Sequence, residues 1–166
     1  VGVGGSQESV IRAARYDFPL MLAIIGGSPT RFTSFIDQYQ NSRKQFNLPV
    51  GEVAIHCPGH IAETDEKAKQ TVWPHLQGMY AKIGRERGWP PMRYDQFQFG
   101  TSPDGAMFIG SPDTVARKIV DVTNLLGVDR FDMKYSNGTM PHEDCMDSIK
   151  LFATEVIPRV RELREE

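Results

Sequence analysis

Short apolar runs alternate with helical patterns along nearly the whole chain, and this alternation constrains the fold more than any single motif. The helical segments carry apolar residues at helical spacing, as Phe32, Phe35, Ile36 and Tyr39 do. The runs that predict strands lie at residues 1–3, 18–25, 50–57, 107–110 and 130–135. Strands that alternate with helices of about 10 to 20 residues predict an α/β fold with a parallel sheet and right-handed crossovers. Two architectures fit this order: an open doubly wound sheet and part of a (β/α)8 barrel.

The first sixteen residues predict a strand, a glycine turn and a helix. Val1 and Val3 are typical of a buried strand, and the glycine pair before Ser6 permits a sharp turn. Ser6 is a favoured N-cap, and Ser9 adds a second hydroxyl within one turn of the positive helix end. Such a turn can hold a phosphate group, or it can be an ordinary capped connection. These residues alone leave both interpretations open.

Residues 89–105 depart from the alternating pattern. The stretch is rich in proline, glycine and aromatic residues, and it predicts an insertion with one short helix. A connection of this length in a compact domain is commonly a lid, a binding loop or an interface. A surface excursion without a function is the alternative.

Length and composition restrict the remaining possibilities. A chain of 166 residues is expected to form a single α/β domain with a substantial core. The net charge of −2 gives no indication of binding to nucleic acid or to an anionic membrane, and no apolar run approaches the about 18 residues of a membrane-spanning helix. Only Cys57 and Cys145 are present, which fits a reducing, cytoplasmic environment. Because the chain begins without Met and inside a predicted core strand, we expect a fragment of a longer protein.

Four motifs resemble the luciferase-like, flavin-dependent monooxygenases, the superfamily of bacterial luciferase. In order along the chain they are Val1-Gly2-Val3-Gly4-Gly5-Ser6-Gln7-Glu8-Ser9-Val10, the strand from Phe18 to Gly27, the stretch from Gly110 to Ile119, and Gly127-Val128-Asp129-Arg130-Phe131-Asp132. Each motif alone is weak, but their order and spacing together resemble the C-terminal half of that family.

The resemblance implies part of a (β/α)8 TIM barrel that holds reduced FMN, or deazaflavin F420 in some branches. A complete barrel needs about 200 to 400 residues, so this chain would supply roughly strands five to eight. The family's flavin phosphate site would correspond to Gly5, Ser6 and Ser9. There, the backbone N–H groups of Gly5 and Ser6 and the hydroxyls of Ser6 and Ser9 would bind the phosphate.

The resemblance also implies an activity, which is the oxidation of a small organic substrate with O₂. A flavin reductase or another source of reduced flavin would be a partner. Because the family's other catalytic residues lie largely in the first half of the barrel, we expect this chain alone to be incomplete and inactive. An F420-dependent oxidoreductase of the same superfamily is an alternative.

Two further hypotheses do not depend on that activity. One is a non-catalytic half-barrel that forms a homo-oligomer through its open sheet edges. The other is an unrelated doubly wound domain that binds a phosphorylated ligand at a switch in strand order.

The residues at the predicted carboxyl ends of the strands are candidates for a pocket. They include Gly26-Gly27 and the turn from Tyr135 to Gly138. His56 and His60 are candidate proton donors or ligand contacts, although a histidine after a strand is commonly a structural hydrogen-bonding group. His56, Cys57 and His60 lack a fourth ligand at a sensible spacing, so we expect no metal site.

Overall fold

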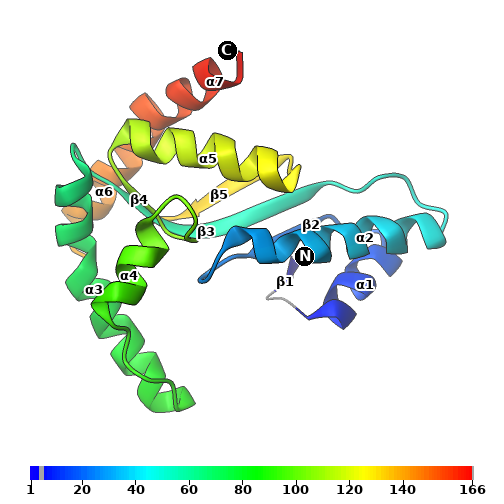
Figure 1. Ribbon diagram of the computed structural model, residues 1–166, viewed down its shortest axis with the longest axis horizontal. Coiled ribbons are helices and arrows are strands. Elements are labelled where there is room, and N and C mark those ends of the chain that lie inside the picture. Colours follow the sequence, from blue (N-terminus) through cyan, green and yellow to red (C-terminus); the bar gives the residue numbers. More distant parts are fainter. Residues whose placement is uncertain (4–5, 166) are drawn as a thin grey trace.

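A parallel sheet with helices on one side forms the centre of the molecule (Figure 1). The computed structural model describes residues 1–3 and 6–165. The strands are β1 (Gly2–Val3), β2 (Leu20–Ala23), β3 (Val53–Ile61), β4 (Phe108–Gly110) and β5 (Arg130–Lys134). The helices are α1 (Gln7–Arg15), α2 (Thr33–Gln45), α3 (Asp65–Arg87), α4 (Tyr94–Thr101), α5 (Pro112–Leu126), α6 (His142–Leu151) and α7 (Ile157–Glu165). The predicted order of strands and helices is confirmed.

Strand β3 is the longest strand and organises the sheet. It pairs with β2 on one side and with β5 on the other, and β1 pairs with the far side of β2. Every pairing is parallel, as the sequence predicts. The partner of β3 changes at Pro58, where pairing with β5 ends and pairing of Gly59 with Phe108 of β4 begins. Proline lacks a backbone N–H donor, so this change of partner is a position where it is tolerated.

Capping residues mark most of the predicted helix ends. Ser6, Thr64 and Ser111 each accept a hydrogen bond from the backbone N–H three residues further on, at 3.2, 3.1 and 3.4 Å. Gly88 and Gly127 end α3 and α5 in the left-handed conformation, with φ values of 69° and 59°.

Three helical segments have local irregularities. Ser28 makes no side-chain cap, and a 3₁₀ turn, η1 (Pro29–Phe32), precedes α2. Helix α3 runs from Asp65 to Arg87 with Pro74 inside it, and Val72 and Leu76 on either side of this proline are both buried. The last helical segment contains a π-helical turn, η2 (Phe152–Val156), between α6 and α7.

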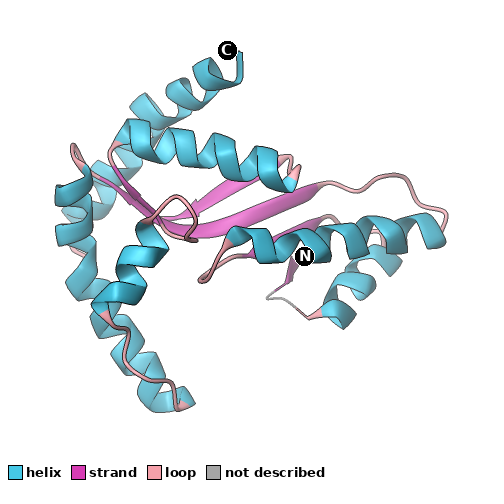
Figure 2. Cartoon of the chain, in the orientation of Figure 1, coloured by secondary structure: helices cyan, strands magenta, loops and turns pink. Residues whose placement is uncertain are grey.

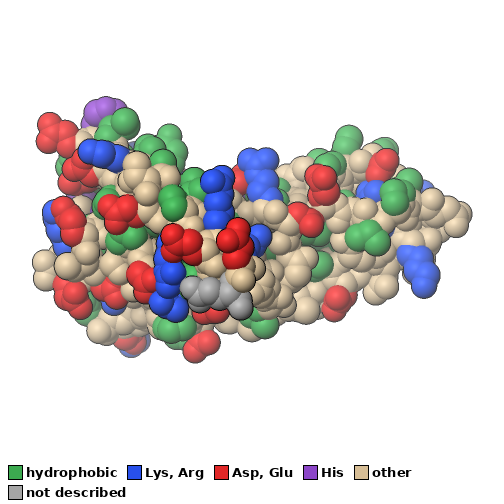
Figure 3. Space-filling view, turned by 90° about the horizontal axis from the view of Figure 1, so that it is seen from above, with side chains coloured by type: hydrophobic (Ala, Val, Ile, Leu, Met, Phe, Trp, Pro, Cys, Tyr) green, Lys and Arg blue, Asp and Glu red, His purple; other side chains and the backbone are tan. Residues whose placement is uncertain are grey.

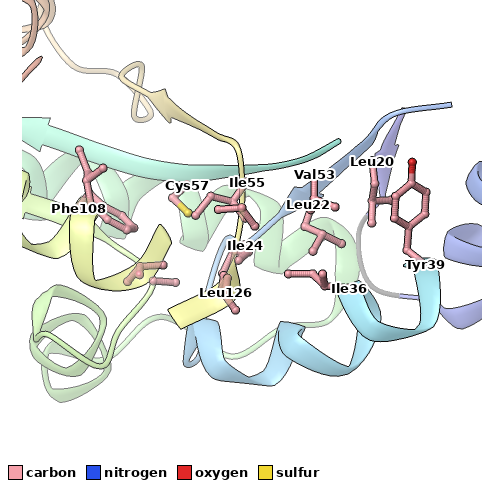
Figure 4. Packing of buried hydrophobic residues seen from close by; sticks show 14 of the residues in the cluster. Leu20, Leu22, Ile24, Ile36, Tyr39, Val53, Ile55, Cys57, Phe108 and Leu126 are labelled. Carbon is pink, nitrogen blue, oxygen red and sulfur yellow. The ribbon is translucent and has the colours of Figure 1, made fainter. Parts of the chain in front are cut away.

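The main hydrophobic core lies between one face of the sheet and the helices that cover it. Figure 2 shows α2 and α5 passing across this face. Alternate strand residues such as Leu22, Ile55 and Cys57 point into this layer, where they meet Ile36 and Leu126 of the helices (Figure 4). Burial of these large side chains provides the main driving force for the fold.

A second, smaller core joins α4 to α3 and to β4. It is built around Phe97 of α4, which is 1% exposed, and Leu76 of α3. The rings of Trp73 and Phe97 lie 5.0 Å apart, and Tyr94 packs edge-on against Trp73 at 5.2 Å. The segment predicted as an insertion therefore carries one short helix, and this helix is anchored in a core of its own.

The opposite face of the sheet is not covered by helices in the same way. Met21, Ala54 and His56 lie on this face and are only half-buried, while their strand neighbours point into the main core. Arg130 and Asp132 of β5 form an ion pair of 2.6 Å beside Ala54 and His56. This face, called the uncovered sheet face below, is where the inside of a closed barrel would be.

The molecular surface is mixed in charge. Seen from above in Figure 3, acidic and basic side chains are interspersed, in keeping with the net charge of −2. Among the helices of the described residues, none has both the length and the apolar character needed to cross a bilayer.

Candidate functional site

The carboxyl ends of β2, β3 and β5 lie at one edge of the sheet, because the three strands are parallel neighbours. Helices α3 and α4 stand beside this edge in Figure 1. In α/β proteins with parallel sheets, ligands bind at this edge, because the connecting loops there can bring side chains from several strands together.

Two adjoining cavities occupy the space between the strand ends and the α3–α4 region. The first has a volume of about 520 Å³ and lies against Gly26, Gly27 and α4. The second has a volume of about 300 Å³ and lies against Ile25, Pro58 and the turn after β5. Both are lined by Tyr80, Trp89 and Met107, so we treat them as one site, the strand-end cleft. Its size and its aromatic lining are typical of a site for a small organic molecule.

The walls of the strand-end cleft are largely apolar, and burial affects its ionisable groups. Desolvation raises the pKa of the Tyr80 phenol, so the phenol stays neutral at ordinary pH. Desolvation lowers the pKa of Lys134, whose side chain lies at the cleft wall. The guanidinium of Arg87 lies 5.2 Å from the centre of the Trp89 ring, which helps to fix that ring. The cleft therefore offers a largely apolar wall against which a small organic molecule can pack.

The expected phosphate turn lies at the start of α1. The Ser6 hydroxyl donates to Ser9 Oγ at 2.9 Å, and Ser6 Oγ accepts from the Ser9 N–H at 3.2 Å. The hydroxyl hydrogen of Ser9 has no acceptor among the described residues. Gly5, the third residue expected in this site, lies outside the described residues. Two hydroxyls at the positive end of a nine-residue helix form a suitable cradle for an anion.

Two charged side chains near this turn, Glu8 and Arg12, would have opposite effects on a bound phosphate. Glu8 lies in the first turn of α1, where its carboxylate would repel a phosphate. Arg12 and Ser9 line the same hollow of about 380 Å³ beside β1, so a positive charge also lies on the Ser9 side of the helix. The residues present therefore fit a phosphate group.

The two candidate histidines lie in different places. His56 is half-buried on the uncovered sheet face, opposite Ala23 on one side and Asp132 on the other. His60 is 2% exposed and lines a separate cavity of about 300 Å³ between β3 and α6. Burial lowers the pKa of His60, while Asp144 acts in the opposite direction. The Nδ1 atom of His60 has no hydrogen-bond partner among the described residues. Neither histidine is among the residues that line the strand-end cleft.

The three potential metal ligands do not converge either. Cys57 points into the main core, away from His56, and burial raises the pKa of its thiol to about 12. Within residues 1–3 and 6–165, no three His, Cys, Asp or Glu side chains are grouped as a metal ion would require.

Some cleft residues could not be identified from the sequence. Tyr80 and Met107 belong to segments whose patterns predict ordinary core positions. The sequence signal that pointed to this site was the departure from the alternating pattern in the stretch that begins at Trp89, since a long connection beside strand ends is commonly functional. The turn from Tyr135 to Gly138, in contrast, was expected at the rim, and Asn137 of this turn does line the cleft.

No protein-family model matches the sequence, and no curated protein does either. Solved structures do match. The monooxygenase RslO1 from Streptomyces bottropensis is 20% identical, with a TM-score of 0.69 over 95% of this chain and 46% of that enzyme. The oxygenating constituent of 3,6-diketocamphane monooxygenase from Pseudomonas putida, solved in complex with FMN, is 17% identical, with a TM-score of 0.70 over 96% of this chain and 48% of that one. The coenzyme F420 dependent tetrahydromethanopterin reductase from Methanopyrus kandleri is 18% identical, with a TM-score of 0.63 over 96% of this chain and 50% of that enzyme.

The chain has the fold of about half of a TIM barrel, the fold of these solved enzymes. At these low identities the likeness concerns the fold, and the fold expected from the sequence motifs is confirmed. The chain spans about half the length of the solved enzymes that it matches. The uncovered sheet face is the counterpart of a barrel interior, which explains why half-buried polar residues lie on it.

Proposed function

We propose that this chain is part of an FMN-dependent, luciferase-like monooxygenase that oxidises a small organic substrate with O₂. The observation that carries the proposal is the Ser6–Ser9 hydroxyl pair at the start of α1. It lies three residues after β1, whose carboxyl end points in the same direction as the carboxyl ends of β2 and β3. A phosphate site and an apolar cleft along one edge suit a phosphorylated, aromatic cofactor.

The residues of the chain have separate tasks in this proposal. Ser6 and Ser9 hold the flavin phosphate through their hydroxyls and through free N–H groups of the first helical turn, and Gly5 contributes backbone N–H. Tyr80 and Trp89 provide the apolar surface that orients the substrate and excludes water. The bound flavin supplies the redox chemistry, and a reductase or another source supplies it in reduced form.

The fold also suits an F420-dependent oxidoreductase, since an F420-dependent reductase is among the structures with the same fold. We give FMN precedence because the enzyme solved in complex with FMN has the slightly higher TM-score, 0.70 against 0.63 for the F420-dependent reductase. Parallel titrations with the two cofactors distinguish these alternatives.

An FMN titration followed by flavin fluorescence tests the phosphate site. We expect FMN to bind more tightly than riboflavin, which lacks the phosphate. Replacing both hydroxyls, Ser6→Ala with Ser9→Ala, should weaken FMN binding by about 1–3 kcal/mol, because hydrogen bonds to a charged group are lost. Riboflavin binding should not change.

The chain offers a matched control for these substitutions. Ser28 and Thr30 form a similar hydroxyl pair, 2.7 Å apart, after the Gly26-Gly27 turn, but Pro29 removes one N–H donor there. Ser28→Ala with Thr30→Ala should leave FMN affinity unchanged. Equal affinity for FMN in the Ser6/Ser9 variant and in the wild type would contradict the proposed site.

A second candidate function is a half-barrel that assembles through its open edges. Among the described residues, β1 pairs with β2 alone and β5 pairs with β3 alone, so each presents an unpaired edge. Unpaired parallel edges favour association with another chain. The oligomeric state of the chain tests this candidate, and a monomer at micromolar concentration would contradict it.

A further inference from the structure

The cavity that His60 lines is separate from the strand-end cleft, and we call it the β3–α6 cavity. It has a volume of about 300 Å³, and its walls come from the end of β3, the start of α3, α6 and η2 (Figure 1). It shares no lining residue with the strand-end cleft. Ser148 of α6 is fully buried and accepts a hydrogen bond from the backbone N–H of Ile61 at 2.9 Å. This bond fixes α6 against β3, so the main fold holds the walls of the cavity in place.

His60 is a buried polar side chain in the wall of this cavity, and its ring has no partner. The residue is 2% exposed, and neither ring nitrogen makes a hydrogen bond among the described residues. Of the two nitrogens, Nδ1 is fully buried and Nε2 is not, so Nε2 is the one that a molecule in the cavity can reach. A buried polar group without a partner is unfavourable, which indicates that a binding group is missing here.

The neighbours of the ring determine which kind of group can bind to it. Burial lowers the pKa of His60, so the imidazole is mainly neutral at pH 7 and can accept a hydrogen bond at Nε2. The charge of Asp144 opposes this shift, so its carboxylate lies within electrostatic reach of the ring. An N–H donor with a positive charge would satisfy both groups.

The cavity as a whole carries an excess of negative charge. Six charged side chains line it: Glu63, Lys67, Asp144, Asp147, Lys150 and Glu155. Four carboxylates and two ammonium groups leave two negative charges in excess, and Glu63 and Lys67 already pair with each other at 2.7 Å. The first turn of α6 offsets Asp144, but Asp147 and Glu155 have no hydrogen bond or ion pair among the described residues. This charge favours a cation and disfavours a phosphate or carboxylate ligand.

The spacing of the acidic groups favours an elongated cation over a metal ion. In the part of the chain that the structure describes, no three potential metal ligands are grouped around one point. Asp144 and Asp147 lie one turn apart on α6, and Glu155 lies further along in the π-helical turn η2. Such π-helical turns are rare and are often found at functional sites. A flexible chain with an ammonium group at each end can reach two separated carboxylates at once.

We propose that the β3–α6 cavity binds a small aliphatic diamine or polyamine. One ammonium group donates to Nε2 of His60 beside Asp144, and the other pairs with Asp147 or Glu155. The inference does not rest on the proposed function, because this site and the strand-end cleft have no residue in common. Exposed ion pairs are weak individually, so the affinity comes from the combination of several contacts.

NMR spectroscopy of the full 166-residue chain tests the site, with putrescine (1,4-diaminobutane) as the probe. The chain has only four histidines, so the ring signals of His60 can be assigned and followed at pH 7. Putrescine should shift these signals and saturate the shift at millimolar concentration. His142 is the internal control, because it is exposed on the same helix outside the cavity, and its signals should stay in place.

Two further solutes separate specific binding from a general effect of solute or salt. 1,4-Butanediol has the same carbon chain without charge, and sodium chloride matches the ionic strength. Neither should shift the His60 signals. Unchanged His60 signals in putrescine, or the same shift with the diol or the salt, would overturn the proposal.

Variants at exposed positions show which carboxylates take part. Asp147→Asn with Glu155→Gln should weaken putrescine binding about tenfold in a calorimetric titration, because two ion pairs are lost. Asp121→Asn with Glu143→Gln is the control, since it removes the same charge at exposed positions outside the cavity. Equal losses of affinity in the two double variants would also overturn the proposal. Neither double variant alters the Ser6–Ser9 pair, so the FMN titration can fail without this inference failing.

Discussion

The ammonium group of Lys118 is buried between α5 and the end of α4. Only 7% of the residue is exposed, and Nζ donates to the carbonyls of Ser102 and Met107 at 2.6 and 2.8 Å. These carbonyls belong to the segment that follows α4, so one side chain of α5 fixes the path from α4 into β4. Desolvation lowers the pKa of Lys118 to about 8.

The lowered pKa predicts a pH dependence of stability. Between pH 8 and the ordinary lysine pKa near 10.5, the unfolded chain binds more protons at this residue than the folded chain. Lys118 therefore makes the free energy of unfolding rise with pH, by about 1 kcal/mol between pH 8 and 9. Cys57 acts in the opposite direction above pH 9, because its thiol stays protonated in the folded chain up to about pH 12.

Urea unfolding at several pH values measures this effect. In Lys118→Met the contribution of Lys118 should be absent, so stability should rise less between pH 8 and 9 than in the wild type. Lys82→Met, at an exposed position on α3, should keep the wild-type profile. Parallel pH profiles for the wild type and Lys118→Met would contradict the prediction.

At the scale of an element, the attachment of α4 depends on one buried ring. Phe97 is 1% exposed and packs against Trp73 of α3, whereas Phe99 on the same helix is 50% exposed. Phe97→Ala should destabilise the chain by about 3–5 kcal/mol, because it leaves a cavity in the smaller core. Hydrogen exchange should increase first in Tyr94–Thr101.

The matched control is Phe99→Ala, which removes the same number of atoms from the same helix. Its ring is half exposed, so we expect a loss below about 1 kcal/mol. Similar losses in the two variants would mean that α4 is not held by the packing of Phe97.

The elements themselves were predictable because their signals are local. Apolar periodicity marked the strands and helices, and Thr64, Gly88 and Gly127 marked helix ends through contacts within a few residues. The strand-end cleft was only partly predictable. Asn137 follows a predicted strand, so its place at the rim could be expected, but Tyr80 enters the cleft because of how α3 packs against the sheet. That packing joins residues far apart in the sequence, and no local pattern reports it.

At the scale of the whole molecule, the sheet has one face packed by helices and one that is not. Leu20 and Leu22 point into the main core, while Met21 between them lies on the uncovered sheet face beside Ala54 and Arg130. In the solved enzymes of the same fold, about half of each chain lies outside the matched part. A closed barrel covers its inner face on all sides, so this face is expected to need a covering partner here.

We therefore expect the purified chain to sediment as a dimer or larger assembly at micromolar concentration, with the uncovered sheet face in the interface. Met21→Lys should raise the dissociation constant about a hundredfold, because association would bury an ammonium without a partner, at a cost of about 3 kcal/mol. Leu125→Lys is the control, since Leu125 is 55% exposed on α5, on the helix-covered side. It removes a similar apolar group and adds the same charge, yet it should leave the assembly intact. A monomeric wild-type chain, or equal dissociation in both variants, would show that the uncovered sheet face is not an interface between copies.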